Sequence, residues 1–523
     1  MNTKAGCFLL LLIFCSALLQ PAVAQEPVAQ RPFRVGVVLS GGGAKGVAHV
    51  GALKVLEEAG IRIDYIGGAS MGAIIGGLYA TGWTAAALDS ILRANNLGKI
   101  LQDEITRDFQ PFFEKQYGEK YALSLSFKDY KVALPQALSN GQTAFDFMSE
   151  LTDGVSSIET FDKLPVPFLC IGTDVSNGKQ VVMERGCLPC AMRASGSLPG
   201  VLAPVEVDGR LITDGGVVNN FPAKEVRDKG MDIVIGITVE AALYTKDELQ
   251  SIEKIIEQVG SYQMEARSRE QMQYCDIVIR PDFTGYGVTS FDATDTLVLR
   301  GEHAAREFWD RLMEIARQQK LAPAPENVVT LSPHDECPMH INAVHLTPNK
   351  AITTQALLKK FPVTLPGDIT FAKFREGIAA LYATDNFQYI DYHFQTAPDG
   401  TRELYIRPKL KPGYERRLRL GLHFDNVYKS SLLLNGTFRN VLFKNSVAAL
   451  DLIIGDKLRY NFHYFVDRGN RPGFGYNSRL NLTNLFIDLP VKVDVGGAYA
   501  LQKLLFNLSD FTQDVYLNLA SNN

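Results

Sequence analysis

Two glycine-rich segments near the start of the chain limit its fold more than any other feature. Residues 41–46 read Gly-Gly-Gly-Ala-Lys-Gly, and residues 68–72 read Gly-Ala-Ser-Met-Gly. Each segment follows an apolar run and precedes a run with helical spacing: residues 34–39 and 64–66 for the strands, 48–59 and 71–80 for the helices. This order predicts two consecutive strand–turn–helix units, which pack as parallel strands with helices on both faces. We therefore expect an α/β fold, a three-layer α/β/α domain.

The same alternation continues for another 240 residues. Further apolar strand patterns and helical runs follow in turn: strands at 167–173, 180–183, 211–213, 233–239 and 275–279, and helices at 140–153, 246–268 and 301–319. Strands that alternate with helices predict a mainly parallel sheet. We place this domain at residues 33–320.

The first glycine-rich turn has two interpretations. Its backbone N–H groups can bind negative charge, as at an oxyanion; the glycines are Gly41, Gly42, Gly43 and Gly46. The spacing also matches a dinucleotide-binding turn, with Glu57, Glu58 and Asp64 near the place of its acidic residue. The next strand, however, runs into a serine turn and not into an acidic strand end. The oxyanion interpretation is therefore preferred.

Ser70 is the candidate nucleophile. Gly68 and Gly72 flank it and allow a sharp turn between strand and helix, which exposes the serine hydroxyl. The alternative is a Gly-x-Ser-x-Gly segment that only packs a helix. A hydroxyl needs a base, and the usual Ser-Asp-His order would place a histidine downstream in the same domain. None occurs between His49 and His303.

Asp214 is the candidate base, because it ends a predicted strand and precedes Gly215-Gly216. An ordinary Asp-Gly turn is the alternative. An aspartate with a pKa near 3.9 is a poor base for serine. Partial burial would raise that pKa, so we predict a semi-enclosed site.

These motifs resemble one known family. Gly-Gly-Gly-Ala-Lys-Gly, Gly-Ala-Ser-Met-Gly and Asp-Gly-Gly occur in the order of the patatin-like phospholipases, and Arg193-Ala194-Ser195 and Leu198-Pro199 resemble the segment between that family's serine and aspartate. The resemblance implies a catalytic dyad of Ser70 and Asp214, oxyanion donors in the 41–46 loop, and hydrolysis of acyl esters of phospholipids or other lipids.

The resemblance also implies that neither a metal nor a cofactor is needed. By analogy the N–H groups of Gly42 and Gly43 stabilise the oxyanion. Lys45 is expected to face solvent, with contact to a lipid phosphate as the alternative, and His49 is expected to be packed and not catalytic. A lipid acyltransferase that uses the same acyl-serine remains open. So does an outer-membrane assembly or transport protein whose patatin domain is incidental.

The first 24 residues read as a secretory signal peptide. Lys4 precedes an apolar run at 6–19, and Ala22-Val23-Ala24 fits a cleavage site. A membrane anchor is the alternative, but the run is short for a membrane-spanning helix.

Export leaves five cysteines, of which Cys187 and Cys190 could form a disulfide in an oxidising compartment. A metal site and buried thiols are the other interpretations of this pair. A net charge of −4 gives no sign of nucleic-acid binding.

The last 186 residues follow two other patterns. Residues 338–410 have the order β-α-α-β-β and resemble a POTRA domain: strands at 340–346, 389–394 and 403–408, and helices at 352–360 and 371–382. From residue 413 to 523, period-two alternation predicts an outer-membrane β-barrel segment, with a soluble β-sandwich as the alternative: 417–424, 431–440, 448–454, 458–465, 478–486 and 515–519.

The whole layout resembles type V secreted patatin-like proteins. It implies an exported protein of the outer membrane whose patatin domain is periplasmic or extracellular, with an acyl-ester lipid as its partner. A homo-oligomer is left open. The chain ends at Ala520-Ser521-Asn522-Asn523 without an aromatic residue, so we expect the barrel to be truncated here.

Overall fold

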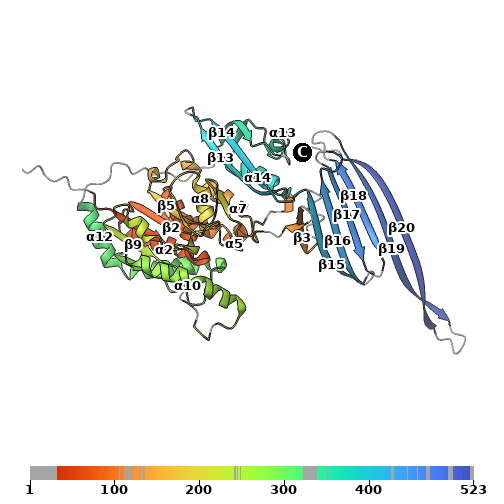
Figure 1. The fold of residues 1–523 in the computed structure, drawn as a ribbon, viewed down its shortest axis with the longest axis horizontal. Helices are drawn as coiled ribbons and strands as arrows, with labels where there is room; N and C mark the ends of the chain where they lie inside the picture. Colours follow the sequence, from red (N-terminus) through yellow and green to blue (C-terminus); the bar gives the residue numbers. More distant parts are fainter. Residues whose placement is uncertain are drawn as a thin grey trace, which may run out of the picture.

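The computed structural model describes these residues of the chain: 32–104, 107–110, 115, 120–128, 131–133, 136–240, 243, 245–247, 249–321, 338–349, 351–397, 399–425, 429–443, 446–455, 457–466, 472–492 and 499–518. The predicted signal peptide at 1–24, Cys337 and the four terminal residues lie outside this set. Three regions follow one another along the chain, and we name them the first domain (33–320), the middle domain (338–410) and the C-terminal sheet (413–518) (Figure 1).

The first domain is built around one sheet. Its strands lie in the order β10 (Ile277–Ile279), β9 (Ile233–Ile237), β1 (Val35–Leu39), β2 (Tyr65–Ala69), β5 (Phe168–Asp174), β8 (Arg210–Asp214) and β7 (Val205–Val207), with β6 (Gln180–Met183) also beside β5. From β10 to β5 neighbouring strands are parallel, and β6, β7 and β8 are antiparallel to their partners. The parallel strands are apolar on both faces because both are covered.

Helices cover the two faces of this sheet, so the predicted three-layer α/β/α fold is confirmed. On one face an apolar cluster joins the strands to α2 (Ala48–Glu58), α3 (Met71–Ala80), α4 (Ala85–Ala94), α7 (Gln142–Leu151), α8 (Leu188–Ser195), α11 (Thr294–Arg306) and α12 (Trp309–Leu321). On the other face, a smaller cluster packs α9 (Ala223–Arg227) and the end of α10 (Ile252–Met272) against the strands. The single helix expected at 301–319 is two helices, α11 and α12.

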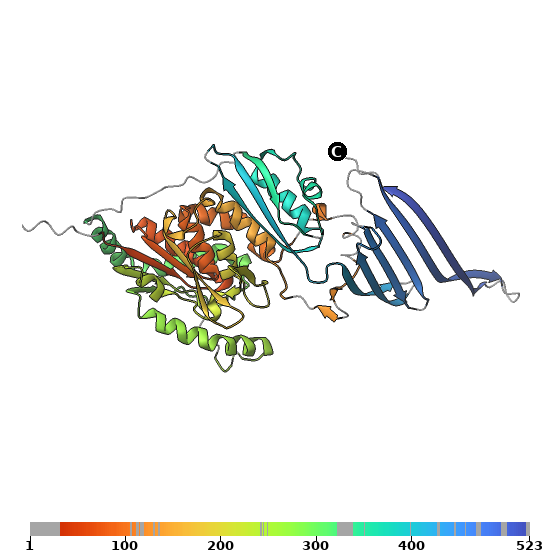
Figure 2. The same ribbon diagram turned by 45° about the horizontal axis from the view of Figure 1, so that its top comes forward.

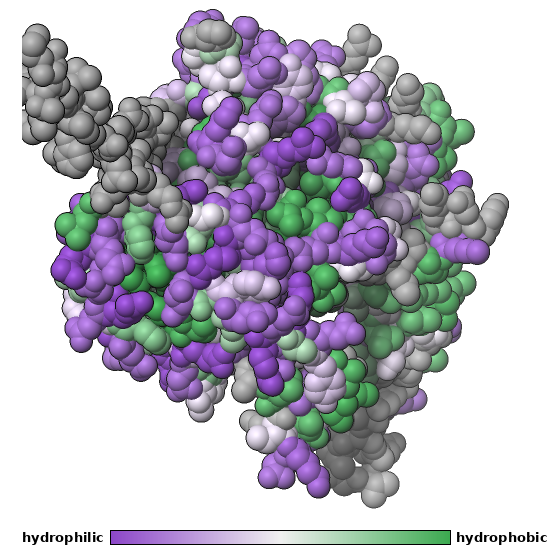
Figure 3. Space-filling model, turned by 60° about the vertical axis from the view of Figure 1, so that its left-hand side comes forward, coloured by the Kyte–Doolittle hydropathy of each residue, from purple (hydrophilic) through white to green (hydrophobic). Residues whose placement is uncertain are grey.

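Short elements complete this domain. They are α5 (Leu97–Leu101) and the 3-10 turns η1 (Gly43–Val47), η2 (Arg107–Phe109), η3 (Asp153–Val155), η4 (Phe161–Lys163), η5 (Gly215–Val217) and η6 (Phe291–Ala293). In the part of the chain that the structure describes, no helix has both the length and the apolar character needed to cross a bilayer. Viewed from the end that carries the first domain, the surface is mostly hydrophilic with small hydrophobic patches (Figure 3).

The middle domain has the predicted order with one added strand. Its elements are β11 (Met339–Leu346), α13 (Thr354–Leu358), β12 (Gly367–Ile369), α14 (Phe371–Tyr382), β13 (Phe387–Thr396) and β14 (Arg402–Leu410). The sheet order is β12-β11-β14-β13, and both helices contribute to one apolar cluster with these strands. The extra strand β12 has only three residues, too few to show an alternating pattern.

The C-terminal sheet is antiparallel, and each strand pairs with the next in sequence. Its strands are β15 (Arg416–Asp425), β16 (Lys429–Arg439), β17 (Ser446–Ile454), β18 (Arg459–Val466), β19 (Gly473–Lys492) and β20 (Tyr499–Asn518). The short strands expected at 478–486 and 515–519 are parts of β19 and β20, which each have 20 residues. Two strands of the first domain, β3 (Leu123–Lys128) and β4 (Lys131–Ala133), extend this sheet beyond β15.

The middle domain packs against α7 and α8, as two views show (Figures 1 and 2). The Gln142 side chain accepts from the Ile390 N–H at 2.7 Å and donates to the Ile390 carbonyl at 3.1 Å. The Arg402 guanidinium donates to both carboxylate oxygens of Asp153, at 2.8 and 2.7 Å. Phe145 of α7 belongs to the apolar cluster of the middle domain.

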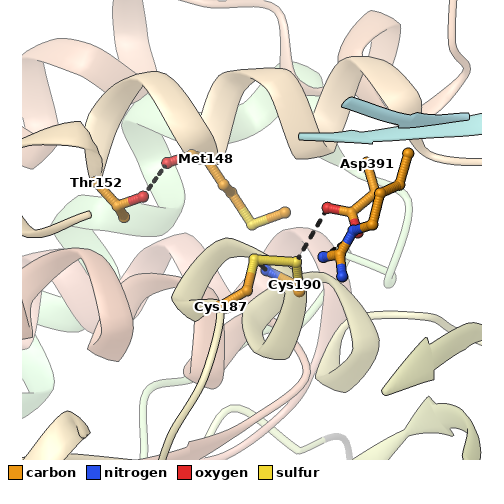
Figure 4. The surroundings of a disulfide bond; sticks show 6 residues. Met148, Thr152, Cys187, Cys190 and Asp391 are labelled. Carbon is orange, nitrogen blue, oxygen red and sulfur yellow. Dashed lines mark hydrogen bonds and ion pairs between the residues drawn. A yellow bond between two sulfur atoms is a disulfide. The ribbon is translucent and has the colours of Figure 1, made fainter. Parts of the chain in front are cut away.

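The predicted cysteine pair is a disulfide at this contact. Cys187 and Cys190 are bonded at the start of α8, and the Cys190 sulfur lies 3.8 Å from a carboxylate oxygen of Asp391 on β13 (Figure 4). Among the described residues, the two cysteines and Asp391 are the one group with metal-ligand geometry. Its two sulfurs are bonded to each other and are not available as thiolates. Cys170 and Cys275 are free thiols.

Candidate functional site

Three chain segments meet at one edge of the main sheet. The glycine-rich loop follows β1 and Ser70 follows β2, and these neighbouring strands are parallel with Leu39 opposite Gly68. Asp214 ends β8, where it pairs with Gly172 of β5. The loop and Ser70 follow the carboxyl ends of parallel strands, the usual binding edge of an α/β sheet. Asp214 reaches the same level from the antiparallel strand β8, because its partner Gly172 comes directly after Ile171, the residue opposite Ala69. The topology therefore brings together the three motifs that the sequence singled out.

Ser70 has a strained backbone. Its φ is 53° and its ψ is −126°, a combination that is rare for any residue but glycine. The two flanking glycines make the turn possible. A Cβ at Gly68 would lie 2.4 Å from the Gly72 carbonyl oxygen, and a Cβ at Gly72 would lie 2.3 Å from the Leu39 carbonyl oxygen. Gly68 and Gly72 are thus required sterically, as expected for a tight strand-to-helix turn.

Ser70 and Asp214 are in direct contact. The Ser70 hydroxyl donates to Asp214 Oδ2 at 2.6 Å, and the Gly216 N–H donates to Asp214 Oδ1 at 2.7 Å. Asp214 is 2% exposed. Loss of water raises its pKa to about 6, although both hydrogen bonds act in the opposite direction. A carboxylate with this pKa accepts a proton near neutral pH far better than an exposed aspartate.

The four glycines of the loop have different roles. The Gly41 N–H donates to Asn220, at 3.2 Å to the side-chain Oδ1 and 3.3 Å to the main-chain oxygen. It is therefore not available to an oxyanion, and this part of the prediction is wrong. Gly46 lies in η1, where a Cβ would approach Met71 Cγ to 2.3 Å, so its role is close packing against α3.

Gly42 and Gly43 remain as donors. Within the described residues their N–H groups meet no backbone or side-chain acceptor, whereas the next residue, Ala44, donates to the Val288 carbonyl at 2.8 Å. Gly43 has a φ of 57°, and a Cβ there would lie 2.4 Å from the Val288 oxygen. Two adjacent free N–H groups on a turn suit an anionic oxygen.

Two further predictions concern side chains beside the loop. His49 is fully buried, its Nε2 lies 2.8 Å from the Ser40 carbonyl oxygen, and burial lowers its pKa to about 4. The expectation that it is packed is confirmed. Lys45, expected to face solvent, is 2% exposed and its ammonium lies 5.8 Å from the Phe283 ring centre. The prediction for Lys45 is therefore wrong: the side chain is buried, and the segment that carries Phe283 lies beside it.

The sequence alone does not reveal the contacts of three residues that hold the site, Ser195, Ser197 and Asn220. Ser195 Oγ accepts from the Ser70 N–H at 3.0 Å and donates to the Ile171 carbonyl at 2.5 Å. The Ser197 carbonyl accepts from the Asp214 N–H at 3.0 Å. The Arg193-Ala194-Ser195 segment resembles the family pattern, but that pattern does not tell which atoms Ser195 contacts. Nothing in the local sequence around Asn220 points to Gly41.

A groove lies between α4, α5 and the segments around Ser139, Val201 and Thr289, and its lining includes neither Ser70, Asp214 nor the 41–46 loop. It has a volume of about 790 Å³ and mixed polar and apolar walls, formed by Leu92, Arg93, Ala94, Asn95, Asn96, Gly98, Leu101, Gln102, Leu138, Ser139, Val201, Thr289, Phe291, Asp292, Thr294 and Asp295. Thr289 follows the residue that binds the Ala44 N–H. The volume lies in the range of small-molecule sites in proteins.

Two family models match the chain. The model of patatin-like phospholipases matches residues 37–227, and that of the OMP85 superfamily matches residues 410–523. An uncharacterized NTE family protein of Mycobacterium tuberculosis is 32% identical over 209 residues, which cover 40% of this chain and 50% of that protein. The lysophospholipase nte1 of Emericella nidulans is 31% identical over 235 residues, 42% of this chain and 14% of that protein. The chain thus spans about half the length, or less, of these curated relatives.

Two solved structures are similar in part. VipD from Legionella pneumophila matches with a TM-score of 0.31 and 16% identity, over 54% of this chain and 68% of that chain. BamA from Haemophilus ducreyi lacking POTRA domains 1–3 matches with a TM-score of 0.24 and 11% identity, over 28% of each chain.

Proposed function

We propose, from the premise that residues 37–227 form a patatin-like phospholipase domain and residues 410–523 an Omp85 superfamily domain, that this protein is a serine acyl hydrolase. Its substrates are fatty-acyl esters of phospholipids or lysophospholipids. The observation that carries the proposal is the 2.6 Å hydrogen bond from the Ser70 hydroxyl to Asp214 at a strained turn. The relatives named as phospholipases or lysophospholipases support the lipid substrate.

In the first half of the reaction Ser70 is acylated. Its Oγ attacks the ester carbonyl carbon while its proton passes to Asp214 Oδ2. The carbonyl oxygen becomes negative and accepts hydrogen bonds from the Gly42 and Gly43 N–H groups, the electrostatic aid that acyl transfer needs most. The bond from the carbonyl carbon to the alcohol oxygen then breaks. Asp214 returns its proton to that oxygen, and the deacylated lipid leaves.

In the second half water releases the fatty acid. Asp214 takes a proton from a water molecule, whose oxygen attacks the acyl carbon. The bond from that carbon to Ser70 Oγ breaks, and the proton on Asp214 returns to Ser70. The pKa of about 6 for Asp214 supports this double role, because the group is mostly unprotonated at neutral pH and still accepts a proton.

The C-terminal region supports a location at the outer membrane. The Omp85 match and the antiparallel sheet from β15 to β20 favour membrane association of residues 413–523. Together with the expected signal peptide at 1–24, they support an exported protein whose first domain is periplasmic or extracellular. We also propose that the middle domain, residues 338–410, is a POTRA-like domain, since its elements follow the expected order β-α-α-β-β with the short strand β12 added.

Labelling with a fluorophosphonate, followed by mapping of the modified peptide, tests the nucleophile. The label is expected on Ser70 in the purified full chain, and Ser70→Ala is expected to abolish both labelling and release of fatty acid from phospholipid vesicles. A label on another serine, or unchanged hydrolysis by Ser70→Ala, would contradict the proposal. Products formed in water with an added alcohol decide between a hydrolase, which yields free fatty acid, and an acyltransferase, which yields a new ester.

A further inference from the structure

We infer that Asn220 is a positioning residue for this reaction, because its side-chain amide fixes the loop that carries the two proposed oxyanion donors. The inference deepens the proposed function and rests on it. Asn220 lies in the turn after Asp214, so one short segment would supply the base and also hold the loop on which the oxyanion depends. Its side chain is 3% exposed and therefore fully committed to protein contacts.

The amide binds both polar groups of one glycine. Asn220 Oδ1 accepts from the Gly41 N–H at 3.2 Å, and Asn220 Nδ2 donates to the Gly41 carbonyl at 3.2 Å. A Cβ at Gly41 would lie 2.3 Å from Asn220 Oδ1 and 2.7 Å from Ser70 Cβ. Gly41 is thus held between the Asn220 amide and the nucleophile, with no space for a side chain.

The contact with the Gly41 carbonyl sets the direction of the first donor. A peptide unit is planar and trans, so its C=O and N–H point in opposite directions. The carbonyl of Gly41 and the N–H of Gly42 belong to the same peptide unit. Because Asn220 Nδ2 binds that carbonyl, the Gly42 N–H must point away from Asn220, and it is free to bind an oxyanion.

A second layer fixes the orientation of the amide itself. Asn220 Nδ2 donates its other hydrogen to Glu240 Oε1 at 2.6 Å, and the buried hydroxyl of Ser268 on α10 donates to the same oxygen at 2.6 Å. A carboxylate only accepts, so the nitrogen of Asn220 must face Glu240. Among the described residues, the charged groups that act on Glu240 are Lys45 and Arg280. A 180° rotation of the amide, which would exchange its oxygen and nitrogen, would break the bonds from Nδ2 to the Gly41 carbonyl and to Glu240.

Asn220 does not touch the reacting atoms, so its loss should act on the rate and not on binding. Misplacement of a catalytic group by about 1 Å costs on the order of a hundredfold in rate. Removal of an oxyanion donor has a similar effect. We therefore expect Asn220 variants to lower kcat by about tenfold to a hundredfold and to leave KM nearly unchanged.

Asn220→Asp gives the sharpest test. The new carboxylate keeps an acceptor for the Gly41 N–H but places an oxygen against the Gly41 carbonyl and against Glu240. The two acidic groups can keep the observed arrangement only while they share a proton. With a 4-nitrophenyl fatty-acyl ester and the purified full chain, kcat should fall at least tenfold between pH 7 and pH 9. In the wild type kcat should stay level over this range.

The double variant Asn220→Asp with Glu240→Gln separates the effect of repulsion between two carboxylates from the effect of the lost hydrogen bond to Gly41. The amide introduced at position 240 can donate to the carboxylate introduced at position 220, so the pair no longer needs a proton. The fall in kcat above pH 7 should disappear, while kcat stays below the wild-type value because the Gly41 carbonyl has lost its donor. A purely structural role of Asn220 would not produce a pH dependence that a second substitution removes.

Asn219→Asp is the matched control. Asn219 is also buried, and its Nδ2 donates to a carboxylate oxygen, Glu225 Oε1, at 3.0 Å, but it does not contact Gly41. This variant should lose a comparable amount of thermal stability without any fall in kcat above pH 7. Should Asn220→Asp fail to fold, Glu240→Ala is measured instead. It should lower kcat severalfold, and Glu240→Gln, which still accepts both hydrogen bonds, should recover most of that loss.

The outcomes distinguish this inference from the proposed function. If the wild type is labelled at Ser70 and turns over, but Asn220→Asp has the same pH profile as Asn219→Asp, or Glu240→Ala has the wild-type kcat, the inference is wrong and the hydrolase stands. If the wild type is neither labelled nor active, the proposed function itself is wrong. An effect on KM alone would assign Asn220 to substrate binding and would also overturn the inference.

Discussion

Asp214 has lost nearly all contact with water but keeps two hydrogen-bond donors, Ser70 Oγ and the Gly216 N–H. Its pKa of about 6 reflects that balance, because loss of water outweighs the donors. The same burial that makes Asp214 a better base makes its charged form costly for the folded protein. Function and stability are thus in conflict at this residue.

The variant Asp214→Asn tests whether the charged form of Asp214 destabilises the folded protein. A raised pKa means that the folded chain holds this proton more tightly than the unfolded chain. The bound proton on Asp214 therefore adds to the free energy of unfolding at pH 4, and this contribution is lost as the pH rises through 6. Above that pH the charged group costs at most about 3 kcal/mol. Asp214→Asn should therefore raise the Tm of the first domain at pH 8 by a few degrees and change it little at pH 4. A lower Tm at pH 8 would contradict this account.

The pH dependence of the wild-type rate follows from the same group. Asp214 must be unprotonated to act as a base, so kcat/KM should rise about tenfold per pH unit below pH 6 and level off above it. Steady-state rates between pH 4.5 and 8.5 measure this directly. A half-maximal rate near pH 4, the value for an exposed aspartate, would show that burial does not tune the base.

At the scale of elements, α8 links the middle domain to Ser70, the proposed nucleophile. Its first turn carries the disulfide beside Asp391, and its last residue, Ser195, binds the Ser70 N–H. Between them the buried Arg193 donates to the Gly141 carbonyl at 3.1 Å and lies 5.7 Å from the Tyr389 ring of β13. One two-turn helix thus contacts the middle domain on one side and holds the strained turn at its end.

Ser195→Ala tests the link at the strained turn. It leaves the Ser70 N–H and the Ile171 carbonyl without a partner at a buried site, which costs on the order of 1–3 kcal/mol. We expect a lower Tm and a kcat about tenfold lower with little change in KM. Thr81→Ala is the control, because it loses a buried hydrogen bond to the Leu78 carbonyl at the other end of α3. Equal kcat values for the two variants would reduce Ser195 to a packing role.

At the scale of the whole molecule, the first and middle domains share a contact that is partly ionic and mostly buried. The Arg402 guanidinium and the Asp153 carboxylate have side chains only 19% and 9% exposed. Breaking such a pair from one side costs about 3–5 kcal/mol, whereas replacing both partners by apolar residues is often neutral. The pair therefore offers a way to measure how firmly the domains are joined.

Arg402→Met should lower the Tm of the full chain by several degrees, because it removes the group to which both Asp153 oxygens are bonded. The double variant Arg402→Met with Asp153→Leu should recover most of that loss. Thermal melting of the two variants beside the wild type gives the comparison. If the single variant melts like the wild type, the contact is weak and the domains are not coupled through it.

Local patterns predicted the elements better than their long-range partners. Most strands of the main sheet, the serine turn and Asp214 follow from runs of a few residues, so the sequence pattern predicts them, whereas the short strands β3, β4, β7 and β12 were not predicted. The bond between Asn220 and Gly41 joins residues 179 positions apart, and the pairing of β3 with β15 joins segments almost 300 positions apart. Neither leaves a local signal. The break between α11 and α12 was missed because the apolar spacing continues across it.

The packing of the middle domain limits how far the first domain can move relative to the C-terminal sheet. β14 ends at Leu410 and β15 begins at Arg416, so only five residues join the middle domain to the C-terminal sheet. The first domain is in turn clamped to the middle domain through Gln142 and Asp153. If the sheet lies in the outer membrane as proposed, these contacts would keep Ser70 and Asp214 at a fixed distance from the bilayer, and a lipid substrate would have to move to them.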